Sequence, residues 1–153
     1  PVYFLMGEEP YYIDQSAYFF LNNIIPVEEQ AFNQIILYGK DCTTEQIIAE
    51  CKQFPFGSTK RVVVIKEAQH LKDIELIDSY LKDPQKSSVL VICYKGKSID
   101  KRKKFGKNLS KKCIGPRWDF VGTRSIVGTP FKVLDEDTIN FFYQQFKTLL
   151  ICF

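Results

Sequence analysis

The sequence has few of the residues on which metal sites and nucleophilic catalysis depend. It contains one histidine, His70, and five cysteines without a Cys-x-x-Cys pair: Cys42, Cys51, Cys93, Cys113 and Cys152. This spacing lacks the pattern of a metal-binding motif, so we predict no bound metal and reduced thiols. No serine or cysteine lies in a nucleophile elbow, so we interpret His70 as an ordinary surface or packing residue and predict no catalytic residue.

A nucleotide-binding loop is also missing. The first turn after an apolar run is Gly7-Glu8-Glu9-Pro10, which places two carboxylates where phosphates need a lysine and a hydroxyl. Gly57-Ser58-Thr59-Lys60 has suitable residue types in the wrong order and ahead of a predicted strand. Glu67 offers one carboxylate where a nucleotide hydrolase needs magnesium ligands. We therefore predict no cofactor and no ATPase activity, and a small NTPase is the weakest of three hypotheses, tested by nucleotide binding.

No apolar run approaches the roughly 18 residues that span a bilayer, and residues 1–6 lack the basic start of a secretion signal. We therefore predict a cytoplasmic chain without a membrane partner. The 153 residues are 45% hydrophobic and 14% aromatic, enough for the core of one globular domain.

Strand and helix patterns alternate along the first two-thirds of the chain. Apolar or β-branched runs predict strands at residues 2–6, 32–38, 61–66 and 89–94. Three- and four-residue spacing predicts helices at residues 11–25, from a cap at Thr43 or Thr44 to Gln53, and in short pieces over 69–81. This alternation predicts an α/β sandwich with a parallel sheet.

The pattern weakens after Ile114, where glycines and prolines interrupt any long element. A last helix is predicted from Thr138 to about Leu150, capped by Asp135 or Asp137. We interpret residues 1–112 as the main domain and 113–153 as its divergent C-terminal part or the end of a fragment.

Positive charge is concentrated in one segment. Residues 95–112 hold nine lysine or arginine residues and one aspartate, although the whole chain carries only +3. Such a block is typical either of a solvated helix face or of a surface that attracts phosphates or an acidic protein. The candidates for a nucleic-acid or subunit contact are Lys101, Arg102, Lys103, Lys104 and Lys107.

Two phenylalanines flank a proline at the end of the second predicted helix. In Gln53-Phe54-Pro55-Phe56-Gly57, the proline and the glycine close the last helical turn, so at least one ring is expected near the tip of the element. An aromatic ring held there would be an anchor for a protein partner. The alternative is that Phe54 and Phe56 both fold under the helix as core, because aromatic residues are usually buried.

Four segments in register over residues 2–112 resemble the delta subunit of the bacterial DNA polymerase III clamp loader. They are residues 5–13, Phe32-Asn33, residues 55–58 leading to 61–64, and residues 89–92 followed by 101–104. The resemblance implies a degenerate AAA+-like domain, a three-layer sandwich without a functional nucleotide site. After about Lys112 the agreement fades.

In that family the domain binds the beta sliding clamp through a hydrophobic pair, which falls here on Pro55 and Phe56, with Gln53, Phe54 and Gly57 as neighbours. A larger aliphatic residue is common where Pro55 stands, which leaves Phe56 as the main anchor. The resemblance implies a non-catalytic role in opening the clamp, with other loader subunits and DNA as further partners. Because the family's lid and collar domains have no counterpart here, we expect clamp binding without stable entry into a loader. The alternative function is a nucleic-acid-binding module that uses residues 95–112.

Overall fold

A five-stranded sheet forms the centre of the part of the chain that the computed structural model describes, which is residues 1–7, 10–96, 99, 102, 104–107 and 149–152. Its strands are β1 (Val2–Gly7), β2 (Gln34–Tyr38), β3 (Arg61–Lys66), β4 (Ser88–Lys95) and β5 (Leu149–Cys152). Their order is β2-β3-β4-β1-β5. The first four strands are mutually parallel, whereas β5 pairs antiparallel with β1.

The two central strands are buried on both faces. Val62 to Ile65 of β3 and Val89 to Cys93 of β4 are all fully buried, as continuous β-branched runs in parallel sheets usually are. Successive side chains point to opposite faces, so Val62 and Val64 pack on one side and Val63 and Ile65 on the other.

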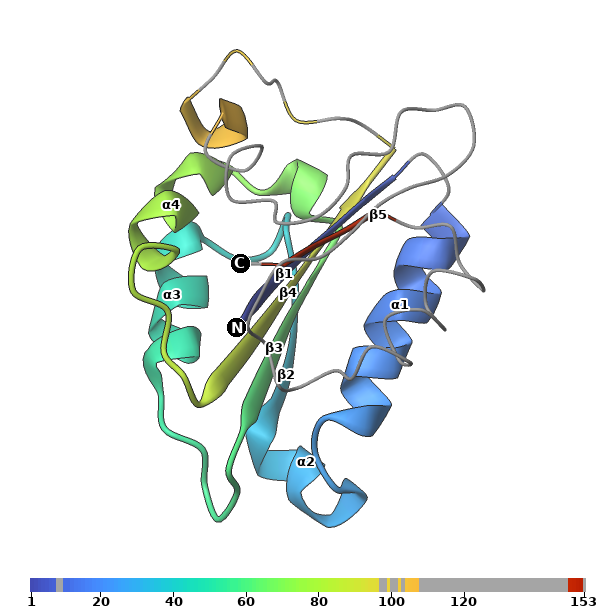
Figure 1. The fold of residues 1–153 in the computed structure, drawn as a ribbon, viewed down its shortest axis with the longest axis vertical. Coiled ribbons are helices and arrows are strands. Elements are labelled where there is room, and N and C mark those ends of the chain that lie inside the picture. Colours follow the sequence, from blue (N-terminus) through green and yellow to red (C-terminus); the bar gives the residue numbers. More distant parts are fainter. Residues whose placement is uncertain (8–9, 97–98, 100–101, 103, 108–148, 153) are drawn as a thin grey trace.

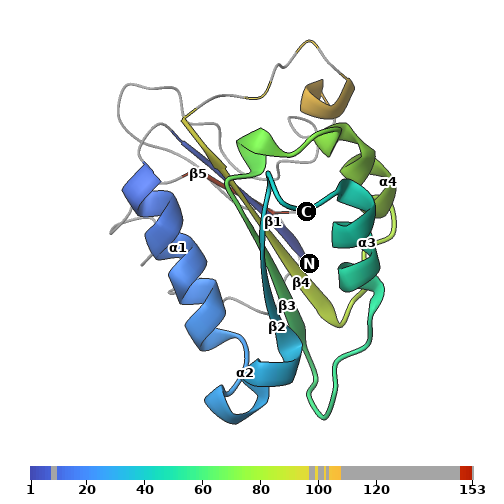
Figure 2. The same cartoon turned by 180° about the vertical axis from the view of Figure 1, so that it is seen from behind.

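Helices cover both faces of the sheet. Helix α1 (Pro10–Asn23) packs on one face through Ile13, Ala17 and Phe20. Helices α3 (Thr44–Lys52) and α4 (Ile77–Tyr80), with the 3-10 turns η1 (Ala68–His70) and η2 (Ile74–Leu76), lie on the opposite face. Figures 1 and 2 show these three layers from opposite sides. The α/β sandwich predicted from the sequence is confirmed.

The predicted cap of α3 is present as a capping box. The Thr43 hydroxyl accepts from the Gln46 amide N–H, and the Gln46 side chain accepts from the Thr43 amide N–H. These two bonds satisfy backbone donors that a helix start leaves open. Thr43 is therefore the cap, and Thr44 is the first helical residue.

Two predicted elements need correction. Residues 32 and 33 were expected to begin a strand, but they end helix α2 (Val27–Asn33), and β2 starts at Gln34. The apolar Phe32 is consistent with either element, and Pro26 allows a helix to restart directly after it. The helix expected over Thr138 to Leu150 is wrong at its end, because Leu149 and Leu150 lie in β5, where they pair with the edge of β1. The rest of that predicted helix falls outside the described residues.

Among the described residues, Cys42, Cys51 and Cys93 are free thiols. Burial raises the pKa of both Cys51 and Cys93 to about 12. In the same part of the chain, no helix has both the length and the apolar character to cross a membrane.

Candidate protein-interaction surface

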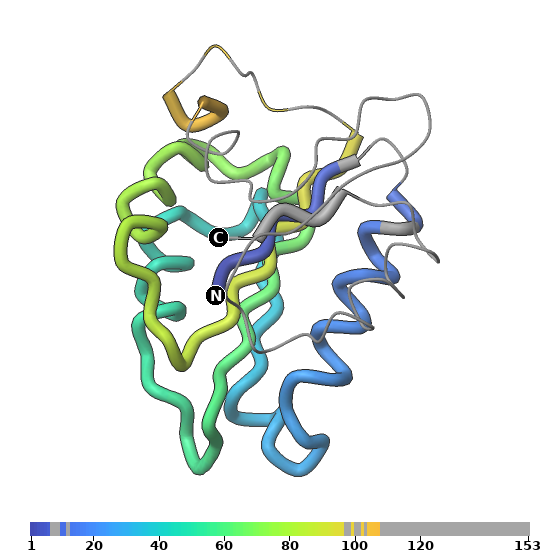
Figure 3. The backbone as a smooth tube through the Cα atoms, in the orientation of Figure 1, coloured from blue at the N-terminus to red at the C-terminus, as the bar shows by residue number. Residues whose placement is uncertain are grey.

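The loop of residues 53–60, called the tip loop below, joins the end of α3 to the start of β3. It lies beside α2 at the lower end of the molecule in Figures 1 and 3, where the parallel strands begin. Helix α3 ends because Pro55 disfavours helical backbone just before it, and Gln53 is already extended. Gly57 adopts φ 62°, a left-handed conformation that glycine takes without strain.

Both phenylalanines of the tip loop face solvent. Phe54 is 82% exposed and Phe56 is 73% exposed. Pro55 between them is half-buried, and Gln53 and Gly57 are exposed. The alternative in which both rings pack under the helix is therefore wrong, because both rings point outward.

The backbone of Phe56 is held by a side chain from α2. Asn33 Oδ1 accepts from the Phe56 amide N–H at 2.6 Å, and Asn33 Nδ2 donates to the Phe56 carbonyl at 2.8 Å. Asn33 itself is fully buried. The ring of Phe32, which is 66% exposed, lies 5.6 Å from the ring of Phe56 between centroids. Phe32, Phe54 and Phe56 are called the aromatic patch below.

Buried polar groups fix the base of the tip loop. Arg61, the first residue of β3, is buried and forms an ion pair with Glu50 at 2.5 Å. Its guanidinium also donates to the main-chain carbonyls of Glu50 and Phe32. One arginine therefore ties β3 to the last turn of α3 and to α2.

Side chains near the start of β4 bind the end of α3. Ser88 Oγ donates to the Cys51 carbonyl at 2.6 Å, and Gln85 Nε2 donates to the Gln53 carbonyl at 3.2 Å. The last carbonyls of a helix have no partner within the helix, so these bonds satisfy groups that would otherwise need water. The tip loop therefore starts from a helix end whose position is fixed.

The opposite edge of the sheet, where the parallel strands end, holds an internal ion pair. Lys95 Nζ at the end of β4 lies 2.7 Å from Asp14 Oδ2 in α1. The Lys95 amide N–H donates to Gln69 Oε1 from η1. His70 next to it is exposed. Glu8 and Glu9, the two carboxylates of the first turn, fall outside the described residues.

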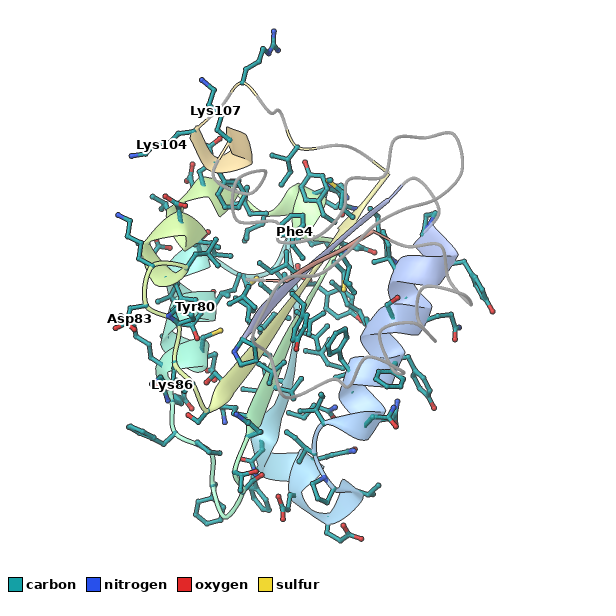
Figure 4. The ribbon with its side chains drawn as sticks, viewed as in Figure 1. Phe4, Tyr80, Asp83, Lys86, Lys104 and Lys107 are labelled. Atoms are coloured by element: carbon teal, nitrogen blue, oxygen red, sulfur yellow. The ribbon has the colours of Figure 1, made fainter. Side chains whose placement is uncertain are left out.

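Part of the basic segment lies at this same edge. Arg102, Lys104 and Lys107 are exposed, and Figure 4 shows Lys104 and Lys107 at the upper end, far from the tip loop. Lys104 borders a groove of about 430 Å³ whose lining also includes Glu45, Glu75 and Asp78. Charge of both signs therefore meets around Lys104. Lys101 and Lys103 lie outside the described residues.

Sequence reasoning missed the contribution of α2 to this surface. Phe32 and Asn33 were part of the resemblance, but they were assigned to a strand, and their contacts with Phe56 span 23 or more positions. No local pattern marks such a contact. Among the described residues, no group of three or more histidine, cysteine or acidic side chains could hold a metal ion.

Comparisons with known proteins agree with the fold and with the sequence motifs. Residues 3–115 match the family described as DNA polymerase III, delta subunit. The chain is 26% identical over 121 residues to DNA polymerase III subunit delta of Bacillus subtilis (strain 168), covering 72% of this chain and 35% of that protein. The solved Bacillus subtilis DNA clamp loader delta protein has a similar fold, with a TM-score of 0.62, 24% identity, and coverage of 72% of this chain and 36% of that one.

The chain thus spans about a third of the length of each of these two relatives. The family match extends over most of the chain, from β1 to beyond β4. On that evidence, the chain belongs to the DNA polymerase III delta subunit family.

Proposed function

We propose that this chain is the clamp-binding part of a clamp-loader delta subunit, and that it binds the beta sliding clamp of DNA polymerase III through the aromatic patch. Once bound, it helps to open the ring for loading onto primed DNA. One observation carries the proposal: Phe54 and Phe56 are 82% and 73% exposed on a loop whose backbone is fixed from beneath.

Burial of the rings and the existing order of the tip loop both favour binding. A phenylalanine that moves from water into a partner's pocket gains about 1.5–3 kcal/mol from burial. Binding normally costs the entropy of ordering the loop that carries the anchor, and a loop already held in its bound shape avoids most of this cost. Pro55 is half-buried, so Phe56 and Phe54 offer more free apolar surface than the proline does.

The proposed role needs no catalysis by this chain. The first turn of the sequence has carboxylates in place of a phosphate-binding lysine. Lys95, which ends a central strand, is already paired with Asp14. The energy for distorting the clamp would come from the contact itself and from nucleotide hydrolysis by other subunits. Such a role belongs in the cytoplasm, where reduced cysteines are expected.

The test is binding of the chain to the sliding clamp of the same organism by surface plasmon resonance. Phe56→Ala is expected to weaken affinity by about 30-fold or more, the equivalent of roughly 2 kcal/mol for a residue that dominates an interface. The melting temperature should not change, because the ring contributes little to the core.

Tyr18→Ala is the matched control. Tyr18 is an aromatic residue with 65% exposure, but it lies on α1, away from the tip loop. Its loss should leave clamp affinity unchanged. Full affinity in Phe56→Ala would remove this residue from the contact. Absence of binding by the folded wild-type chain would instead favour the nucleic-acid alternative, with DNA affinity falling steeply as salt rises.

A further inference from the structure

The hydrogen bonds between Asn33 and Phe56 are unusual because Phe56 is exposed. The backbone of a surface loop is normally free to bond to water. Here both main-chain groups of Phe56 bond to one buried side chain, at 2.6 and 2.8 Å. One buried side chain from α2 therefore satisfies both main-chain groups of Phe56.

The amide of Asn33 can take only one orientation in this site. Its Nδ2 donates to the Phe56 carbonyl and to the Glu29 carbonyl at 3.1 Å, while its Oδ1 accepts from the Phe56 amide. A flipped amide would face two carbonyls with its oxygen and an N–H with its nitrogen. The position thus requires a side chain of this length that both donates and accepts.

Helix α2, which carries Asn33, is braced on two sides despite having only seven residues. Gln34 Nε2, one residue beyond the helix, donates to the Leu21 carbonyl of α1 at 2.7 Å. Arg61 donates to the Phe32 carbonyl at 3.1 Å from β3. The backbone on either side of Asn33 is therefore fixed, so its side chain can hold the tip loop in place.

The ring of Phe32 supports the ring of Phe56. The two rings are tilted by 52° at a centroid distance of 5.6 Å, within the range of favourable aromatic pairs. Both rings remain mostly exposed. The contact restricts the rotamers of Phe56 without burying it, which preserves its apolar surface for a partner.

We propose that α2 and the tip loop form one docking unit for the sliding clamp, in which Asn33 is a positioning residue that holds Phe56 outward and Phe32 is a second contact residue. This inference rests on the proposed function for the identity of the partner. The positioning itself is a property of the free chain, so it is testable without any clamp.

The first experiment is amide hydrogen exchange followed by NMR on the free chain. In the wild type, the Phe56 amide is expected to exchange slowly for a residue in an exposed loop. Asn33→Ala should speed its exchange roughly tenfold or more, while the amides of Val64 and Leu90 in the central strands keep their protection. Unprotected exchange of the Phe56 amide in the wild type would overturn the positioning role, and a general loss of protection in the variant would indicate a purely structural one.

The second experiment is a double-mutant cycle on clamp affinity with Asn33→Ala and Phe56→Ala. If Asn33 acts through Phe56, its replacement weakens binding about tenfold in the wild-type background and has little further effect once the ring is gone. Equal effects in both backgrounds would contradict the inference.

Phe32→Ala is the second variant, because it keeps every main-chain hydrogen bond and should fold even if Asn33→Ala does not. We expect it to weaken clamp binding about three- to tenfold, as loss of a contact ring at the edge of an anchor does. An unchanged affinity would exclude Phe32 as a contact residue and overturn that part of the proposal. If the wild-type chain does not bind the clamp at all, the proposed function fails, while the exchange experiment still decides the role of Asn33.

Discussion

The two edges of the parallel sheet differ in where their polar groups are directed. At the edge where the strands end, Lys95 pairs with Asp14, so two charges neutralise each other within the chain. At the edge where the strands begin, Asn33 and Arg61 bond to the main chain beneath the tip loop. The aromatic rings above this second network stay exposed.

Open α/β sheets usually bind ligands at the carboxyl ends of their strands. In this chain the best-defined candidate surface is at the opposite edge. Part-buried hydrogen bonds from Asn33 and Arg61 hold the backbone there. A loop that is already ordered loses less entropy when it binds a partner. Under the proposed function, recognition of the clamp takes place at the edge where the strands begin, opposite to the edge that such sheets usually use.

The largest effect is expected from Arg61→Met, at the edge where the parallel strands begin. This change keeps the apolar stem of the side chain and removes the guanidinium. The Glu50 carboxylate and two carbonyls would then lose their donor. We expect a loss of about 3 kcal/mol in the free energy of unfolding, since the partly buried Glu50 carboxylate and the two carbonyls would all lose their donor. For a domain of this size, this equals a fall of roughly 10 °C in melting temperature by calorimetry.

Lys60→Met is the control for Arg61→Met. Lys60 is adjacent in sequence, and its ammonium makes one exposed hydrogen bond, to the Lys86 carbonyl. We expect this control to change stability by less than about 1 kcal/mol. If the two variants were equally stable, the network under the tip loop would contribute little.

A rise in pH is expected to destabilise the chain through one buried thiol near each edge. Burial, with smaller effects from Glu50 at Cys51 and from Asp14 at Cys93, raises both pKa values to about 12 from an ordinary 9.0. A group with a raised folded-state pKa contributes its full stability below pH 9 and loses it as pH rises toward 12. By pH 10 each thiol should lower the free energy of unfolding by roughly 1 kcal/mol.

Urea titrations at pH 8, 9 and 10 measure this loss. Cys51→Ala and Cys93→Ala are each expected to lower overall stability through a cavity, yet to flatten its pH dependence by one proton. An unchanged slope in either variant would show that its thiol ionises as readily in the folded chain as in the unfolded one.

The smallest loss of stability is expected from Lys95→Met, at the edge where the parallel strands end. The side chains of Lys95 and Asp14 are 18% and 44% exposed, so solvent screens their attraction. We expect a loss of less than about 1 kcal/mol by thermal unfolding, smaller still at high salt, and no change in clamp affinity. A large loss of clamp binding would show that the edge where the strands end also takes part in docking. The two edges would then no longer differ in function.

The sheet and its main helices follow from local signals in the sequence. The β-branched run predicts β3, and the cap predicted at Thr43 or Thr44 is found at Thr43, because burial and capping act within a few residues. The boundary at Asn33 was wrong because the helix there is short and is held by contacts from Arg61 and α1 rather than by its own periodicity. The pairing of β5 with β1 joins residues about 150 positions apart, beyond the reach of any periodic pattern.

The candidate surface was predictable only in part. Pro55 and Gly57 indicated that the helix stops, and this correctly placed aromatic residues at a tip. Sequence could not decide between an exposed and a buried ring, because that depends on whether a distant side chain takes up the backbone of the loop. Asn33 supplies this bond, and its polarity alone gave no sign of its partner.

The link between Asn33 and Phe56 also determines what would be needed to transplant this candidate recognition element. Residues 53–60 grafted alone onto another scaffold would carry the two rings but not the amide that orients one of them. A functional graft must bring α2 as well, or supply an equivalent donor and acceptor from the new scaffold. Under the proposed function, the portable unit is therefore two segments of chain separated in sequence, and a peptide copied from the loop alone would be an incomplete inhibitor of clamp binding.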